Sequence, residues 1–106
     1  MRLNHNYYLY IVECADGFYY TGVTNDVERR VIEHNNGIDQ SCFTYRRRPV
    51  ILKYYLRFQF IEQAIAFEKQ VKGWNRKKKE ALFKEDWDEI IKLAALRSNK
   101  NESNEP

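Results

Sequence analysis

Three short segments of the chain are rich in β-branched and aromatic residues, a composition typical of strands. They cover residues 8–14, 18–23 and 50–57. The first two segments are separated only by Ala15, Asp16 and Gly17, a sequence suited to a tight turn. The pattern therefore predicts a three-stranded sheet that begins with a hairpin.

Apolar residues recur at helical spacing in the remaining segments. We expect helices over residues 26–35, 60–74, 75–84 and 86–96. Asn25 is expected to cap the first helix, with Glu28 three residues later and Gly37 just beyond its end. The order ββαβαα, with one more helix at the end, predicts a small α/β domain of the α+β kind. In such a domain, helices flank a mostly antiparallel three-stranded sheet.

Two polar residues interrupt the apolar face of the first expected helix. Val27, Arg30, Val31 and His34 follow one another at the spacing of a single helical face. Arg30 and His34 therefore lie beside the two valines. The ordinary explanation is a short helix from which the Arg30 side chain extends its charged end to water.

A carboxylate interrupts the second helix in the same way. Glu68 falls inside a continuous apolar arc made by Phe60, Ile61, Ala64, Ile65, Phe67, Val71 and Trp74. Burial of an unpaired carboxylate costs several kcal/mol, so a core-facing Glu68 needs a cation or a metal ion as its partner. The alternative is a partly exposed or salt-bridged residue.

Two tyrosines of the hairpin are further candidates for chemistry. A two-residue turn at Asp16 and Gly17 would place Tyr10 and Tyr20 on opposite faces of the sheet. A three-residue turn that also includes Ala15 would place both phenols on one face, nearly side by side. The residues of the turn suit both arrangements.

Length and composition bound the organisation of the chain. Its 106 residues can bury one core, and we place a single domain at residues 1–96 with a disordered polar tail at 97–106. The start lacks the apolar run of a signal peptide, and no apolar stretch approaches ~18 residues. Cys14 and Cys42 do not have zinc-ligand spacing. We expect a cytoplasmic monomer with reduced thiols and no membrane partner.

The charge pattern suggests a polyanionic partner. The net charge is only +3, but seven of the 18 Lys and Arg residues lie in two runs, residues 46–48 and 76–79. Such runs are usually solvated loops and helix faces. Two of them on a short chain make contact with a nucleic-acid backbone a hypothesis to pursue.

The ordered set of these residues resembles a known family. Tyr8-Leu9-Tyr10, then Tyr20-Thr21-Gly22, then Arg30 with His34 four residues later, and finally Glu68 resemble the motifs of the GIY-YIG nuclease superfamily. The run from Glu68 to Lys79 is similar to its small stand-alone bacterial branch. The resemblance covers roughly residues 7–83. The first motif departs from the family pattern, because only its final Tyr10 matches.

The resemblance implies an endonuclease that hydrolyses phosphodiester bonds in nucleic acid, DNA rather than RNA, in repair or recombination. It implies one Mg²⁺ or Mn²⁺ ion on Glu68, with Arg30 on a non-bridging oxygen and Tyr20 orienting water or phosphate. Tyr10 is the expected general base. His34 is the alternative base or proton relay, because an imidazole titrates near ~6.5 and a phenol near ~10.

Basic side chains are expected to hold the nucleic-acid backbone. These are Arg46, Arg47, Arg48, Lys72, Arg76, Lys77, Lys78 and Lys79. The alternative function is a catalytically inactive nucleic-acid-binding module of the same fold. Because the three-residue turn alone places both phenols in one cleft with Arg30 and His34, we expect that turn.

Overall fold

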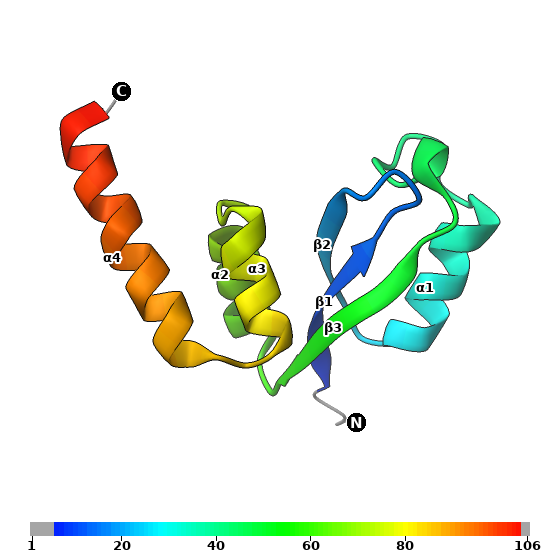
Figure 1. Ribbon diagram of the computed structural model, residues 1–106. Helices are drawn as coiled ribbons and strands as arrows, with labels where there is room; N and C mark the ends of the chain where they lie inside the picture. Colours follow the sequence, from blue (N-terminus) through cyan, green and yellow to red (C-terminus); the bar gives the residue numbers. More distant parts are fainter. Residues whose placement is uncertain (1–5, 105–106) are drawn as a thin grey trace. The chain divides into compact units, whose positions relative to one another are not determined.

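The computed structural model describes residues 6–104 (Figure 1). The chain divides between Gly73 and Trp74 into two compact units. The first unit contains the sheet and the first two α-helices, and the second contains the last two. The assignment of residues 1–96 to one domain stays a prediction.

The first unit is built on a three-stranded antiparallel sheet. Strand β1 (Tyr7–Glu13) lies in the middle, between β2 (Tyr19–Thr24) and β3 (Ile51–Phe58). Both pairings are antiparallel. The predicted α+β fold, with a small antiparallel sheet and flanking helices, is confirmed.

The two faces of β1 pack against different helices. Tyr10, Val12 and Cys14 alternate along one face and form a buried cluster against α1 (Val27–Asn36). Leu9 and Ile11 are fully buried on the other face. Figure 1 shows α1 on one side of the sheet and α2 (Ile61–Lys72) on the other. The sheet therefore carries a core on each face.

The hairpin uses the expected three-residue turn. The Cys14 N–H donates to the Phe18 carbonyl at 2.8 Å, and the Gly17 N–H donates to the Cys14 carbonyl at 2.9 Å. Gly17 has φ +91°, which glycine adopts without a steric penalty. The register pairs Tyr10 with Gly22, and it places Tyr10 and Tyr20 on the same face of the sheet.

The cap of α1 differs from the prediction by one residue. The helix begins at Val27, so Asp26 occupies the capping position, and its Oδ1 accepts from the Arg29 N–H at 3.0 Å. Asn25 lies one residue too early and accepts instead from the Arg29 side chain at 3.2 Å. Gly37, with φ +66°, follows the helix as expected.

Helix α2 buries a narrower stripe than its apolar residues suggest. Ala64 and Val71 are fully buried, whereas Phe60, Ile61 and Ile65 are 51%, 40% and 37% exposed. A straight helix against a three-stranded sheet covers one side of its circumference only. The continuous apolar arc predicted for this helix is therefore buried only in part.

The second unit is helical. Helix α3 (Arg76–Phe83) is capped by Asn75, whose Oδ1 accepts from the Lys78 N–H at 2.9 Å. Helix α4 (Trp87–Asn104) starts at Asp86, whose Oδ1 accepts from the Glu89 N–H at 3.1 Å. It extends beyond residue 96, where the sequence predicts its end. Within residues 6–104, no helix has the length and apolarity needed to cross a membrane.

Candidate active site

A hydrogen bond between Tyr10 and His34 lies at the centre of the candidate site. Tyr10 extends from β1, His34 lies in the last turn of α1, and their Oη and Nε2 atoms are 2.7 Å apart. The residues are 1% and 4% exposed, respectively. Burial, reinforced by the Arg30 charge, lowers the pKa of His34 to about 4. The imidazole is therefore neutral at pH 7.

Thr44 binds the other nitrogen of His34. Its Oγ1 lies 2.8 Å from His34 Nδ1 and donates to Cys42 Sγ at 3.4 Å. With the threonine hydrogen directed at sulfur, Nδ1–H donates to Oγ1, and Nε2 is left to accept the hydrogen of the Tyr10 hydroxyl. The chain Cys42–Thr44–His34–Tyr10 thus directs a proton acceptor at the phenol.

Arg30 approaches the same phenol. Its guanidinium hydrogen-bonds the Tyr10 oxygen, and its Nη1 lies 3.0 Å from Glu33 Oε1. Glu33 Oε2 is also 3.2 Å from Arg29 Nε. Burial raises the pKa of Tyr10, and the Arg30 charge opposes this shift only in part. Tyr10 therefore stays protonated at pH 7, and its oxygen accepts from Arg30.

Tyr20 completes the group. Its ring centroid lies 6.4 Å from that of Tyr10 and 5.3 Å from that of His34, and its hydroxyl hydrogen-bonds the Cys42 thiol. Burial raises the pKa of Tyr20 far above the ordinary phenol value. Tyr20 is therefore a neutral hydrogen-bonding group at pH 7.

The structure explains why a glycine stands at position 22, the last residue of the Tyr-x-Gly sequence. A Cβ atom at Gly22 would lie 2.6 Å from the Tyr10 hydroxyl oxygen and 2.7 Å from Cζ. Gly22 is the cross-strand partner of Tyr10, so the Tyr10 ring lies directly over it. Any other residue at position 22 would force the phenol away from His34.

Glu68 lies on α2, on the other side of the sheet from α1. Its side chain is 19% exposed, and its Oε2 is 3.2 Å from Lys72 Nζ. After burial and smaller contributions, the Glu68 charge also raises the pKa of Tyr10. Glu68 is therefore half-buried and paired with Lys72. This matches the alternative given by the sequence, a partly exposed or salt-bridged residue.

The chain is similar in sequence to a family model and to several known proteins. The model of the GIY-YIG catalytic domain matches residues 6–81. The chain belongs to the GIY-YIG family. A UPF0213 protein of Bacillus pumilus is 42% identical over 76% of this chain and 82% of its own length. Another, from Halobacterium salinarum, is 46% identical over 73% of this chain and 99% of its own length.

A solved structure supports the fold. The solution structure of the protein EF2693 from E. faecalis aligns with a TM-score of 0.54 and 35% identity. The alignment covers 79% of this chain and 88% of that one. The GIY-YIG resemblance and the small α+β domain expected from the sequence are thus confirmed.

The arginine run of this GIY-YIG chain divides into different environments. Arg47 Nε lies 3.1 Å from Asp16 Oδ2. Arg48 donates to the Tyr45 carbonyl at 2.8 Å and lies over the Tyr45 ring. Arg46 is exposed, and no interaction of its side chain is found among residues 6–95. Arg46 is therefore the arginine of this run best placed to meet a phosphate.

The basic residues after α2 are also unequal. Arg76 Nε pairs with Glu80 Oε2 at 3.1 Å. Lys78 is buried, and its ammonium lies 4.5 Å from the centre of the Trp74 ring. Lys77 is exposed and Lys79 is half-buried. Lys78 is the least suited of these residues to bind a nucleic-acid backbone.

Sequence reasoning missed Thr44, Cys42 and Glu33 as neighbours of the site. Thr44 and Cys42 lie in the loop between α1 and β3, which has no periodicity from which a facing direction could be inferred. Glu33 could have been predicted from the sequence. It lies three residues after Arg30 and four after Arg29, which is the spacing of ion pairs along a helix.

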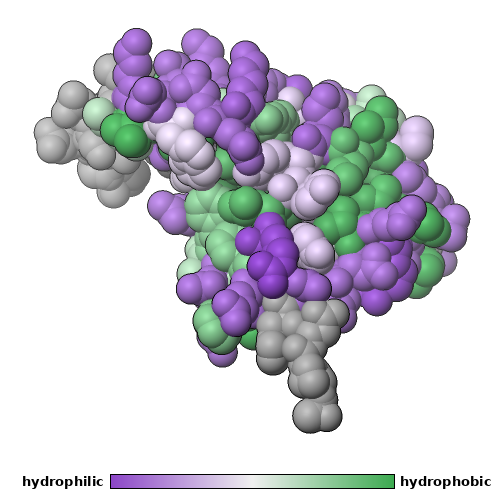
Figure 2. All heavy atoms as spheres, turned by 90° about the horizontal axis from the view of Figure 1, so that it is seen from below, coloured by the Kyte–Doolittle hydropathy of each residue, from purple (hydrophilic) through white to green (hydrophobic). Residues whose placement is uncertain are grey.

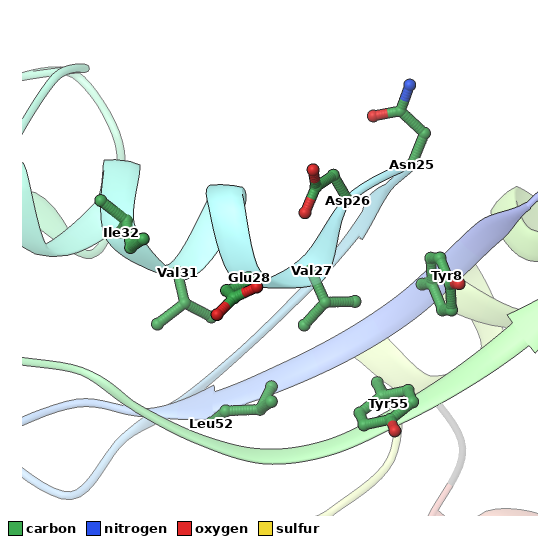
Figure 3. Close-up of a pocket in the computed structure, with 9 residues that line it drawn as sticks. All are labelled: Tyr8, Asn25, Asp26, Val27, Glu28, Val31, Ile32, Leu52 and Tyr55. Atoms are coloured by element: carbon green, nitrogen blue, oxygen red, sulfur yellow. The ribbon is translucent and has the colours of Figure 1, made fainter.

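Two hollows of very different size lie near the residues described above. The hollow beside Arg30, His34, Cys42 and Thr44 has a volume of only about 10 Å³. A groove of about 610 Å³ lies elsewhere, between α1 and β3 (Figure 3), and contains none of the predicted site residues. In Figure 2, apolar side chains gather on the side where Figure 1 places α1 and β3.

Proposed function

We propose that this chain is a divalent-metal-dependent endonuclease that hydrolyses phosphodiester bonds in nucleic acid, with DNA as the preferred substrate. The observation that carries the proposal is the buried Tyr10–His34 hydrogen bond, backed by Thr44 and approached by Arg30. A GIY-YIG catalytic domain over residues 6–81 supports the same chemistry.

The proton path runs from water through Tyr10 to His34. A neutral phenol is a poor base by itself, since its deprotonation near pH 7 costs about 4 kcal/mol even at the ordinary pKa of ~10. As the attacking water transfers a proton to Tyr10 Oη, Tyr10 transfers its own proton to His34 Nε2. The negative charge of a bound phosphate raises the pKa of His34 and favours this transfer. Tyr10 is thus the relay, and His34 is the final acceptor.

Arg30 and Tyr20 handle the phosphate. The Arg30 guanidinium stabilises the negative charge that develops on a non-bridging oxygen, the role for which a charged donor is strongest. Glu33 holds Arg30 in place through its 3.0 Å ion pair. Tyr20 stays protonated and orients water or phosphate through its hydroxyl.

Glu68 would hold the metal ion. No group of three or more His, Cys, Asp or Glu side chains suited to a metal lies among the residues that the structure describes. One half-buried carboxylate fits a hard cation such as Mg²⁺ or Mn²⁺ that takes its other ligands from water and substrate. When bound, the ion supplies charge neutralisation at the phosphoryl oxygens. Its affinity without substrate is expected to be low.

The variant Glu68→Gln tests the proposal. It keeps the shape and removes the charge, so cleavage of DNA with Mn²⁺ should be lost while binding in EDTA stays about unchanged. The partly exposed i,i+4 pair with Lys72 contributes only about 0.3–0.5 kcal/mol, so the melting temperature should change little. Glu80→Gln is the matched control, because Glu80 forms the same i,i+4 pair with Arg76 at 3.1 Å.

The alternative is an inactive nucleic-acid-binding module. The 3.2 Å pair between Glu68 and Lys72 favours it, because this pair gives the carboxylate a partner without a metal. The panel should include branched, flapped, nicked and single-stranded DNA together with RNA. Suppose that the wild type cleaves none of these substrates while Glu68→Gln melts at a lower temperature. This result would reject the nuclease function in favour of an inactive binding module.

A further inference from the structure

Two large aromatic side chains are exposed beside the candidate site. Phe18, in the hairpin turn, is 56% exposed, and Phe43, in the loop after α1, is 42% exposed. Their ring centroids are 6.2 Å apart, and their planes are nearly perpendicular at 89°. We call Phe18, Phe43 and the adjacent Arg47 the aromatic platform.

The platform is continuous with the catalytic rings. The Phe43 ring lies nearly parallel to that of Tyr20, with an interplanar angle of 15° and centroids 6.1 Å apart. Phe43 also stands in the chain between Cys42 and Thr44, which contact the site through sulfur and hydroxyl. A molecule that contacts Phe18 and Phe43 therefore lies next to Tyr20.

Arg47 holds the platform in place. Its guanidinium carbon lies 4.0 Å from the centre of the Phe43 ring and 5.5 Å from that of Phe18. Its Nη1 donates to the Phe43 carbonyl at 3.2 Å, and its Nε lies 3.1 Å from Asp16 Oδ2. The Ala15 N–H donates to the Arg47 carbonyl at 2.8 Å, which fixes the loop to the hairpin. The rings are thus preorganised, with a cation against them.

Single exposed apolar side chains are ordinary and need no function. Phe43 has the Arg47 guanidinium over its ring and lies nearly parallel to Tyr20, so Phe18, the more exposed ring, is the one that presents a face to a base. An exposed ring beside a guanidinium, next to the proposed phosphate site, matches the surfaces on which nucleic-acid bases stack. A base inside a duplex has both faces covered by its neighbours, so a base that stacks on the platform must have at least one free face, as an unpaired base outside a helix does.

We propose that the aromatic platform stacks an unpaired base adjacent to the scissile phosphate, so that the substrate is a nucleic-acid strand with a single-stranded nucleotide at the cleaved position. This inference rests on the proposed nuclease function. It narrows the substrate class to single strands, flaps, gaps and loops. A fully paired duplex lacks the base that would occupy the platform.

Binding in EDTA tests the platform without any cleavage. Wild type and variants are titrated with single-stranded DNA, single-stranded RNA and duplex DNA, each carrying the fluorescent base 2-aminopurine. Loss of one base–aromatic stack should weaken single-strand binding roughly five- to a hundredfold. We expect this loss, together with loss of 2-aminopurine quenching, for Phe18→Ala and Phe18→Leu. Phe18→Trp should retain both.

Tyr55→Ala is the matched control. Tyr55 is 55% exposed, against 56% for Phe18, and lies on β3, at the opposite edge of the sheet from β2. It lines the groove shown in Figure 3. Its removal should leave single-strand binding unchanged. The Leu variant keeps an apolar side chain at position 18, so it separates stacking from simple apolar contact even if Phe18→Ala is unstable.

The outcomes separate the platform from the nuclease. Unchanged single-strand affinity in Phe18→Ala and Phe18→Leu, or an equal loss on duplex DNA, overturns the platform even if Glu68-dependent cleavage is found. If the Phe18 variants bind single strands as expected but the wild type cleaves no substrate, the platform is supported and the nuclease function is rejected. A preference for the DNA or the RNA strand that Phe18→Ala abolishes identifies the strand whose base is stacked.

Discussion

A neutral imidazole buried between two hydroxyl groups makes the folded protein sensitive to acid. The pKa of His34 is about 4 in the folded chain, against ~6.5 when exposed. As the pH falls below ~6.5, the unfolded chain takes up the proton first. The stabilisation is therefore complete above about pH 6.5 and is lost as the pH falls through about 4, with a total of roughly 3 kcal/mol.

Urea unfolding at pH 7 and pH 4.5 measures this contribution. The wild type should lose roughly 2–3 kcal/mol more than His34→Gln between the two pH values. Carboxylates titrate in both proteins, so they cancel in the difference. An identical pH dependence in the two proteins would show that His34 is accessible to protons in the folded state.

Single residues also show where sequence reasoning stops. Arg30 and His34 could be singled out because they interrupt an apolar helical face, and Tyr10 and Tyr20 because strand alternation places them on one side after a three-residue turn. Thr44 could not, since a loop without periodicity does not reveal which side chain will reach His34. That contact depends on how the loop folds back over α1.

At the scale of elements, composition predicted the three strands and periodicity predicted the four α-helices of the described chain, with boundaries shifted by a few residues. What it could not predict was which apolar positions of α2 would be covered. Burial depends on the neighbour that a helix meets, and Ile65 remains 37% exposed on a helix whose Ala64 is fully buried. A helical pattern gives the face but not its width.

The start of α1 gives a test at this scale. Asp26→Ala removes the carboxylate that accepts the Arg29 N–H, and it should lower the free energy of unfolding by about 1 kcal/mol. Asn25→Ala is the control, because its exposed contact with the Arg29 side chain should contribute less than about 0.5 kcal/mol. Urea midpoints of the two variants check the ranking. A larger loss for Asn25→Ala would return the cap to the residue that the sequence suggests.

At the scale of the whole molecule, the net charge is small, so the positions of individual cations matter more than the total. The net charge of +3 gives little long-range attraction, so the proposed phosphate contacts depend on individual exposed cations such as Arg46. Arg46→Gln should reduce the slope of log K against log salt by roughly 0.9, the value for one phosphate contact. Equal slopes in the wild type and Arg46→Gln would exclude Arg46 from the interface.

Arg47→Gln should weaken single-strand binding through the platform. It should also lower the stability of the fold, because Arg47 pairs with Asp16.

The residues proposed to handle the proton and the phosphate come from a different part of the gene than the proposed metal ligand. Tyr10, Tyr20, Arg30, His34 and Thr44 lie within one continuous stretch, residues 10–44, whereas Glu68 comes from α2 on the other side of the sheet. A single codon change at position 68 would leave the first group intact. If the proposed function holds, one substitution at position 68 therefore converts a nuclease into a nucleic-acid-binding protein. The reverse substitution restores the nuclease, and the residues that bind the strand stay unchanged.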